Sequence, residues 1–239
     1  MDKHFRVETI RCTPNPQQVC WLAMHQDYTA DAVVDRLDKC PNETKAGEYL
    51  VSHCLKFNHY GILEHPQITF NVVGFPHHTV MQLRTHRVGI SFDVSSLRYC
   101  SQHIIDVATG DKQVEEVFFL RQPGTYTDRH GAKYELTQIK YDYFKTIIKD
   151  ICLEYNECLA CGMSEEHARE LIPMSIRQNF VLSLNPRSLL HVLDLRFPKD
   201  AQEEIRHFSE LLFLRFAEWM PEVAQWYSEK RLGKNKLAP

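Results

Sequence analysis

Apolar residues recur along the chain with two different periods, and each period predicts a different kind of element. Alternation of apolar and polar residues is typical of a half-buried strand, whereas a spacing of three and four residues is typical of an amphipathic helix. Residues 67–74 (QITFNVVG) alternate and predict a strand. Between residues 132 and 161 apolar side chains recur every three or four positions, which predicts one long helix closed by Gly162.

The rest of the chain is expected to supply more elements of these two kinds. Further strands are predicted over residues 5–12, 114–120 and 176–184. Residues that favour helix starts, such as Ser, Asn and Pro, predict additional helices. These helices span residues 14–24, 42–57, 76–87, 164–171, 185–195 and 201–220. Residues 89–99 are expected to be extended or irregular, and residues 122–131 to form turns. Long helices with a few strands favour an α+β fold, in which a small mixed or antiparallel sheet packs with the helices.

Composition and charge narrow the class of protein. At 44% hydrophobic and 25% charged residues, with no linker, repeat or low-complexity tract, residues 1–239 are interpreted as a single compact domain. No apolar run approaches the roughly 18–20 residues that span a bilayer, and the first residues lack the apolar stretch of a secretory signal. We therefore expect a cytoplasmic protein that does not contact membranes. The net charge of −3 argues against general nucleic-acid binding, which requires a basic surface.

The cysteines and histidines do not predict a metal site. Without an export signal, the eight cysteines are expected to be free thiols, most of them small buried side chains. Cys158 and Cys161 have metal-like spacing, but no second pair follows at zinc-ribbon distance. A group of histidines and one acid also matches no standard ligand set. Its members are His59, Glu64, His65, His77 and His78.

An arginine-rich stretch over residues 82–99 is the first candidate binding segment. It holds three arginines against a single acid, Asp93, in a chain that is net acidic. The arginines are Arg84, Arg87 and Arg98. A helix over residues 76–87 would place Arg84 and Arg87 on one face, and an extended segment over residues 94–99 would place Ser96 beside Arg98. Such planar donors with neighbouring hydroxyls suit phosphate, although a solvated basic helix face explains the charges equally well.

A second candidate segment lies at residues 185–196 (NPRSLLHVLDLR). Asn185 is expected to cap a helix whose first N–H groups point outward and attract anions. Arg187 and His191, four residues apart, would share one face of this helix. Arg196 falls at its end, where the helix dipole stabilises a cation. The alternative is that Arg196 only caps the helix and His191 is an ordinary surface residue.

Several common catalytic motifs are absent from the sequence. Neither G-x-G-x-x-G nor G-x-x-x-x-G-K-[ST] occurs, so a Rossmann dinucleotide site or a Walker loop is not supported. There is also no G-x-S-x-G nucleophile elbow and no H-E-x-x-H zinc motif.

Together these segments resemble the flavin-dependent thymidylate synthases. That family carries R-H-R, then seven or eight residues, then S-x-R; here His86-Arg87 is followed by residues 88–95 and by Ser96-Leu97-Arg98. Upstream, His59 and Glu64-His65 before the strand of residues 67–74 resemble a family segment. Downstream, Arg169 in HARELIP and the stretch of residues 185–196 match the carboxy-terminal pattern. The resemblance runs in order from about residue 44 to residue 220.

The sequence departs from the family pattern at three places. It reads Arg84-Thr85-His86-Arg87 instead of an uninterrupted R-H-R, whose first arginine helps to hold flavin phosphate. The Asn-Glu pair of the family falls on Asp93-Val94, where Asp93 is a stand-in for the glutamate. A Ser or Thr of the family falls on Gly61, which leaves only backbone contacts there.

The resemblance implies reductive methylation of deoxyuridine monophosphate (dUMP) to the thymidine nucleotide (dTMP). It implies 5,10-methylenetetrahydrofolate as carbon donor and NADPH-reduced FAD as hydride source, without a cysteine nucleophile. It also implies a homotetramer with shared active sites. Arg196 would stabilise the ionised uracil nitrogen, which is an electrostatic catalytic role.

The remaining assignments follow from the same resemblance. The dUMP-binding residues would be Gln82, Arg84, Ser95, Ser96, Leu97, Arg98, Arg169 and Arg196. The FAD-binding residues would be His59, Gly61, Glu64, Thr85, His86, Arg87, Val94, Asn185, Arg187 and His191, with His59 between flavin and folate. Two rival functions remain at this point: a catalytically inactive nucleotide-binding protein, and a metal-dependent phosphohydrolase that uses the histidines.

Overall fold

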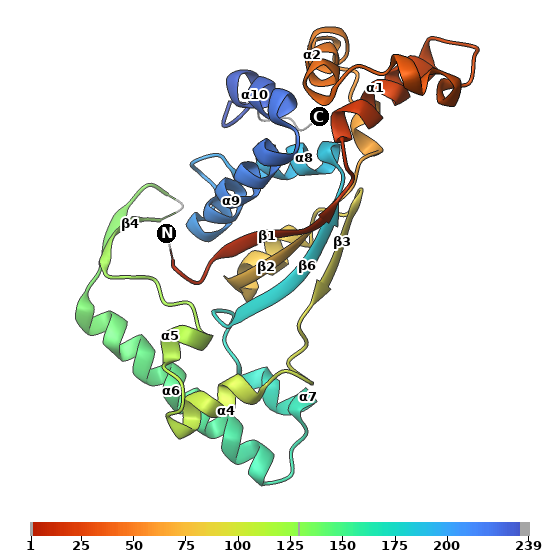
Figure 1. The fold of residues 1–239 in the computed structure, drawn as a ribbon. Coiled ribbons are helices and arrows are strands. Elements are labelled where there is room, and N and C mark those ends of the chain that lie inside the picture. Colours follow the sequence, from red (N-terminus) through yellow and green to blue (C-terminus); the bar gives the residue numbers. More distant parts are fainter. Residues whose placement is uncertain (1, 129, 235–239) are drawn as a thin grey trace. The chain divides into compact units, whose positions relative to one another are not determined.

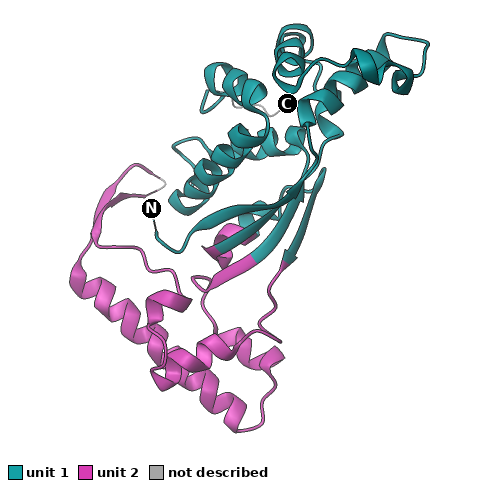
Figure 2. Cartoon of the chain, viewed as in Figure 1, with its two compact units in different colours: residues 1–73, 81–93, 180–239 teal, residues 74–80, 94–179 magenta. Residues whose placement is uncertain are grey.

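The computed structural model describes residues 2–128 and 130–234, which form two compact units. Unit 1 comprises residues 1–73, 81–93 and 180–239, and unit 2 comprises residues 74–80 and 94–179 (Figure 2). Both units combine helices with short strands, as the labelled ribbon shows (Figure 1). The α+β class predicted from the sequence is confirmed.

A four-stranded sheet has the order β1-β2-β6-β3. Its strands are β1 (Arg6–Cys12), β2 (Ile68–Pro76), β6 (Arg177–Leu184) and β3 (Ile90–Val94). β1 and β2 are antiparallel, with Arg6 opposite Val73 and an irregularity between Thr9 and Arg11. Every second side chain at the start of β2 is apolar and buried, because successive side chains of a strand point to opposite faces of the sheet. The sequence pattern predicts this alternation.

The helices of unit 1 lie either between β1 and β2 in the sequence or after β6. They are α1 (Pro16–Asp27), η1 (Val33–Lys39), α2 (Glu43–His53), η2 (Leu55–Phe57), η3 (Gly61–Glu64), α8 (Pro186–Arg196), α9 (Glu203–Trp219) and α10 (Pro221–Lys230). α9 packs on β1 (Figure 1), where Arg215 Nε donates to the Val7 carbonyl at 2.9 Å. Further along, Trp219 Nε1 donates to the Thr13 carbonyl at 3.0 Å.

Unit 2 contains a two-stranded antiparallel sheet and helices around a separate core. Its elements are α4 (Gln102–Thr109), α5 (Val114–Val117), β4 (Gly124–Thr127), β5 (Lys133–Leu136), α6 (Gln138–Ala160), α7 (Glu165–Ala168) and η4 (Arg169–Leu171). Helix α3 (His77–Leu83) has residues in both units. The core of unit 2 includes Val107, Phe118, Tyr155 and Ile176, all nearly or fully buried.

Several helix boundaries are confirmed at the level of the capping residue. Asn42 accepts a hydrogen bond from Lys45 N at 2.9 Å, and Asn185 accepts one from Ser188 N at 2.8 Å. These bonds satisfy N–H groups that a helix start leaves unpaired. Gly162 follows α6 with a φ of +89°, a conformation that favours glycine.

Two predictions about unit 2 are wrong. Residues 114–120, expected as a strand, begin with the helical turn α5, because Gln113 and Glu116 form a reciprocal capping box. The helix expected over residues 132–161 begins later, because residues 133–136 form strand β5 and pair with β4. Thr137 then caps the start of α6, since its Oγ1 accepts a hydrogen bond from Lys140 N. Helices α4 and α10 were not predicted from the sequence.

One prediction about the arginine-rich stretch is also wrong. The helix expected over residues 76–87 is shorter, because α3 ends at Leu83 and His86 N then donates to the Leu83 carbonyl. Arg84 and Arg87 therefore do not share a helix face. Residues 89–99 are extended in β3 and irregular after it, as expected, and residues 96–100 form a turn because Tyr99 N and Cys100 N both donate to the Ser96 carbonyl.

All eight cysteines are free, as expected. The expectation that most of them are buried is wrong. Only Cys20, Cys54 and Cys152 are buried, whereas Cys161 is exposed and Cys158 is intermediate. Burial raises the pKa of the Cys152 thiol to about 11.

None of the helices in the described ranges combines the length and apolar composition that crossing a bilayer requires.

A buried carboxylate holds α8 against α10. The Asp194 side chain is fully buried, accepts from the Tyr227 hydroxyl at 2.6 Å, and pairs with Arg231 Nη2 at 2.8 Å. These partners offset the cost of removing a carboxylate from water. Burial is the larger cause of the raised pKa of Tyr227, and the hydrogen bond to Asp194 is the second cause. The phenol therefore stays protonated and donates its hydrogen to Asp194.

Replacing this carboxylate is expected to destabilise the protein. Asp194→Asn should lower the free energy of unfolding by about 3 kcal/mol, because breaking a buried ion pair leaves the other charge poorly solvated. The measurement is urea unfolding followed by circular dichroism. The matched control is Glu8→Gln, in the exposed pair with Arg6, which should cost less than about 1 kcal/mol. Equal losses for the two variants would contradict this assignment.

Candidate functional site

The start of α8 packs against the loop before β3. Gly89 has a φ of +66°, and a Cβ atom added there would lie 2.4 Å from Ser188 Oγ and 2.6 Å from Asn185 Nδ2. Ser188 Oγ also donates to the Val88 carbonyl at 2.7 Å. The predicted capping residue Asn185 therefore has a second role, because it packs directly against the arginine-rich stretch.

The guanidinium of Arg196, the last residue of α8, is held against the turn after α3. Its Nε donates to His86 Nε2 at 3.0 Å, and its Nη2 donates to the Gln82 carbonyl at 3.2 Å and to Thr85 Oγ1 at 3.0 Å. Thr85 Oγ1 itself donates to the same carbonyl at 2.8 Å. The two predicted segments thus meet at Arg196. Its side chain reaches the turn at residues 82–86, so a role as a helix cap alone does not describe it.

His86 is held in its neutral form. An arginine Nε carries a hydrogen, so the His86 Nε2 that faces it must be an unprotonated acceptor. Burial of the ring, then the charge of Arg196 and the neighbouring His191, lower the pKa of His86 to about 4. The His191 ring lies edge-on to His86, with centroids 5.1 Å apart. Burial also lowers the pKa of His191, although Asp194 opposes this effect.

The other end of the α8 face carries a cation that is already paired. Arg187 Nη1 contacts Glu64 Oε1 at 2.6 Å, which joins α8 to η3. Both side chains are substantially exposed, so this pair is screened by water and contributes little to stability. The contact nevertheless places Glu64 next to Arg187, two residues that the resemblance assigns to FAD.

The remaining predicted residues of unit 1 are exposed. Arg84 and Arg87 make no side-chain hydrogen bond or ion pair with another described residue. His59 accepts or donates at Nδ1 toward the Tyr28 hydroxyl, 3.4 Å away. A Cβ added at Gly61 would meet nothing within 4 Å. The exposed guanidinium groups of Arg84 and Arg87 are consequently available to an anionic ligand.

Unit 2 brings together two other predicted arginines. Arg98 Nη2 lies 3.6 Å from Glu166 Oε2, and Arg169 Nε donates to the Glu166 carbonyl at 3.1 Å. The Arg98 guanidinium also lies over the Tyr99 ring, 5.4 Å from its centroid. Arg98 and Arg169 therefore both contact Glu166, Arg98 through its carboxylate and Arg169 through its backbone carbonyl.

The residues next to Arg98 have mainly structural contacts. Ser95 Oγ donates to Gln178 Oε1 at 2.9 Å, and Ser96 Oγ accepts from Arg98 N at 3.4 Å. Leu97 packs against the core of unit 2, and Val94 ends β3. Asp93, the expected stand-in for a glutamate, is exposed on β3.

Further residues complete these clusters. Gln202 directly follows Ala201 in the carboxy-terminal pattern of the family, and its Oε1 accepts from Gln82 Nε2 at 2.6 Å. Glu166 and Gln178, which no sequence signal identifies, contact the predicted residues Arg98 and Ser95 across long stretches of the chain. In the part of the chain that the structure describes, no three His, Cys, Asp or Glu side chains gather as metal ligands.

These observations define an α+β protein with arginine-rich clusters suited to anionic ligands. A family model described as "Thymidylate synthase complementing protein" matches residues 8–222. The flavin-dependent thymidylate synthase of Halobacterium salinarum is 33% identical over 252 residues, covering 98% of this chain and 100% of that relative. The chain therefore belongs to the flavin-dependent thymidylate synthases, a family of enzymes with a flavin cofactor, and the resemblance seen in the sequence is confirmed.

Solved structures share the fold. A UMP/dUMP methylase, PolB from Streptomyces cacaoi bound with 5-Br dUMP, superposes with a TM-score of 0.72 at 22% identity, covering 98% of this chain and 97% of that one. Thymidylate synthase X from Helicobacter pylori, with FAD and dUMP, gives a TM-score of 0.70 at 18% identity, covering 94% and 98%. At these identities the likeness establishes the fold.

The protonation state of His86 is directly measurable. In an NMR titration the ring protons of His86 should report a pKa near 4, assigned by comparison with His86→Gln. Arg196→Gln should raise this value, because it removes a nearby positive charge. Unfolded histidine titrates near 6.5, so the unfolded chain binds the extra proton between these values, and stability should fall as pH decreases from about 6.5 to 4. A His86 pKa of 6.5 in the folded protein would refute the neutral assignment.

Proposed function

We propose that the protein converts dUMP to dTMP, with 5,10-methylenetetrahydrofolate as carbon donor and NADPH as reductant of bound FAD. The hydrogen on the uracil carbon is replaced by a methyl group, whose carbon comes from folate. Family membership supports the reaction class. The observation that carries the proposal for this chain is the Arg196 guanidinium, which joins the two family segments through its contacts with His86, Gln82 and Thr85.

Arg196 is proposed to act on the uracil ring electrostatically. A guanidinium is always charged, so it can stabilise a negative charge that develops on a uracil nitrogen. Neutral His86 adds no competing positive charge, and its hydrogen bond to Nε leaves Nη1 of the guanidinium for the substrate. Because these contacts exist before substrate binds, little reorganisation is needed during the reaction.

The nucleotide is proposed to bind through its phosphate to Arg98 and Arg169, with Gln82, Ser95, Ser96 and Leu97 positioning it. The Arg98–Glu166 pair is long and exposed, so it contributes little stability. A phosphate can therefore replace the Glu166 carboxylate on Arg98 at small cost and gain a bidentate contact. Arg84 is assigned to this nucleotide site as well, on the basis of the resemblance.

The residues of unit 1 fit a bound flavin dinucleotide. The exposed guanidinium group of Arg87, which has no described partner, suits a phosphate of this dinucleotide. Asn185, together with Arg187 and His191 on α8 and Glu64 of η3, would hold the remainder. His59, Gly61, Thr85 and His86 complete the set in unit 1, and Val94 of unit 2 is assigned to FAD on the basis of the resemblance. When bound and reduced, the flavin supplies the hydride. The family resemblance also supports a homotetramer with shared sites as part of this proposal.

The reaction itself is the first test. Purified protein with FAD, dUMP, methylenetetrahydrofolate and NADPH should form dTMP, measured by liquid chromatography, and flavin absorbance should bleach when NADPH is added without oxygen. Cys100→Ala should retain near wild-type turnover, since no cysteine nucleophile is proposed although this thiol is exposed near Ser96. Protein that binds no FAD and forms no dTMP would remove the proposal, and nucleotide binding alone would favour the inactive alternative.

The second test is the charge of Arg196. Arg196→Ala should bind FAD normally but lose about 10²–10³ in the rate of dTMP formation, the usual cost of removing one preorganised donor. Arg196→Lys should restore little, because a point ammonium cannot make the Nε and Nη2 contacts together. Arg6→Ala, in an exposed pair on β1, is the matched control and should keep full activity. Near-normal turnover of Arg196→Ala would show that the catalytic assignment is wrong.

A further inference from the structure

A cavity of about 760 Å³ lies in unit 1 and has no role in the site described above. It is formed by α1, the end of η1 and α2, which pack together near the amino-terminal end of the chain. Its volume falls within the range of roughly 300–1,000 Å³ that is usual for small-molecule sites. None of the residues assigned to FAD or dUMP lines it.

Aromatic rings from two helices face this cavity. On α1, the rings of Trp21 and His25 are stacked, with centroids 3.6 Å apart and planes at 28°. On α2, the rings of Tyr49 and His53 lie 5.5 Å apart. Each pair is four residues apart on its helix, so both members project to the same side. Both helices therefore contribute aromatic rings to the lining of the cavity, and such rings favour contact with another flat ring.

The charge of the lining is positive. Lys39 and Lys45 line the cavity, and neither ammonium group makes an ion pair with another described residue. Among the described residues, no carboxylate and no arginine lines the cavity. Lysine acts as a compact point charge, whereas arginine is preferred where a planar fork must hold phosphate. This lining favours a ligand that combines a flat ring with carboxylates.

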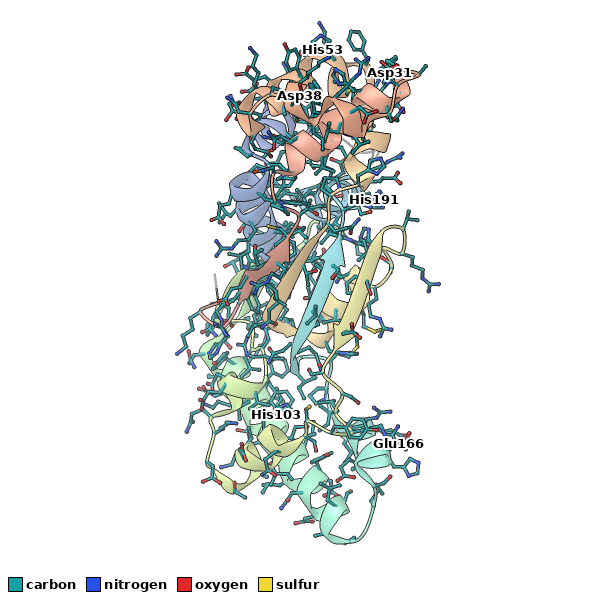
Figure 3. All side chains as sticks on the ribbon, turned by 45° about the vertical axis from the view of Figure 1, so that its right-hand side comes forward. Asp31, Asp38, His53, His103, Glu166 and His191 are labelled. Carbon is teal, nitrogen blue, oxygen red and sulfur yellow. The ribbon has the colours of Figure 1, made fainter. Side chains whose placement is uncertain are left out.

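The cavity adjoins a residue of the proposed FAD segment. Tyr28 lines the cavity, and its hydroxyl lies 3.4 Å from Nδ1 of His59. Figure 3 shows His53 on the α1–α2 part of unit 1 and His191 further along, on α8. A ligand that reaches from the cavity past Tyr28 would thus extend toward His59.

We propose that this cavity binds the benzoylglutamate part of the folate cosubstrate. The benzoyl ring would lie between the Trp21–His25 and Tyr49–His53 pairs, and the glutamate carboxylates would pair with Lys39 and Lys45. The identity of the ligand as folate rests on the proposed function. The ring-and-carboxylate chemistry of the cavity rests on its lining alone.

The test is calorimetric binding of p-aminobenzoyl-triglutamate to the full-length, FAD-loaded protein. The fragment should bind, and the double variant Lys39→Gln/Lys45→Gln should raise its Kd by about tenfold or more, because charge-assisted contacts are lost. Both lysines are exposed, so folding should be unaffected, and FAD affinity should be unchanged. Lys149→Gln removes an exposed charge on α6, outside the cavity, and is the matched control.

Each further result separates this site from the proposed function. The protein could form no dTMP while the double variant still loses affinity for the fragment. This result would support the ligand assigned to the cavity and refute the proposed reaction. If dTMP forms but the double variant keeps the wild-type KM for triglutamylated folate and the wild-type Kd for the fragment, the cavity assignment is overturned. No binding of the fragment by the unmodified protein, or its displacement by NADPH, would also overturn it.

Discussion

The organisation of the α8 region depends on one buried carboxylate. Asp194 has no access to water, so it requires hydrogen-bond donors, and Tyr227 and Arg231 of the carboxy-terminal part provide them. Arg231 Nη1 also reaches the Tyr60 hydroxyl at 3.5 Å, beside His59. Through Arg231 the interaction therefore links α8 to Tyr60, the residue that precedes η3. Arg187, His191 and Arg196 all extend from the helix that it holds.

The chemistry proposed for this region follows from its charge balance. Placing a guanidinium and two imidazoles close together is tolerated because burial keeps His86 neutral and lowers the pKa of His191. Arg196 is then the fixed positive charge beside these two rings, and it is partly buried and held by three acceptors. Electrostatic stabilisation is strongest where such a charge is preorganised away from bulk water.

The exposed ion pairs have the opposite character. Arg98–Glu166 in unit 2 and Arg187–Glu64 in unit 1 are accessible to water, and breaking either one costs little. Arg98 and Arg187 can therefore exchange these carboxylates for an anionic ligand at small cost. Buried contacts thus hold the helices, while weak surface pairs leave these two guanidinium groups available.

The sequence by itself determined the α+β class, the principal strands, the Asn42 and Asn185 caps and the family, because periodicity, capping chemistry and ordered motifs are local properties. It could not determine where α3 ends, that residues 114–117 are helical, or that residues 133–136 pair with β4, because these outcomes depend on competing contacts elsewhere in the chain. The residues of the candidate site were predicted mainly from ordered motifs. Their interactions were decided only by tertiary structure: the Arg196 side chain is far from His86 in sequence, and its desolvated contact with that ring exists only when α8 packs against the turn at residues 82–86.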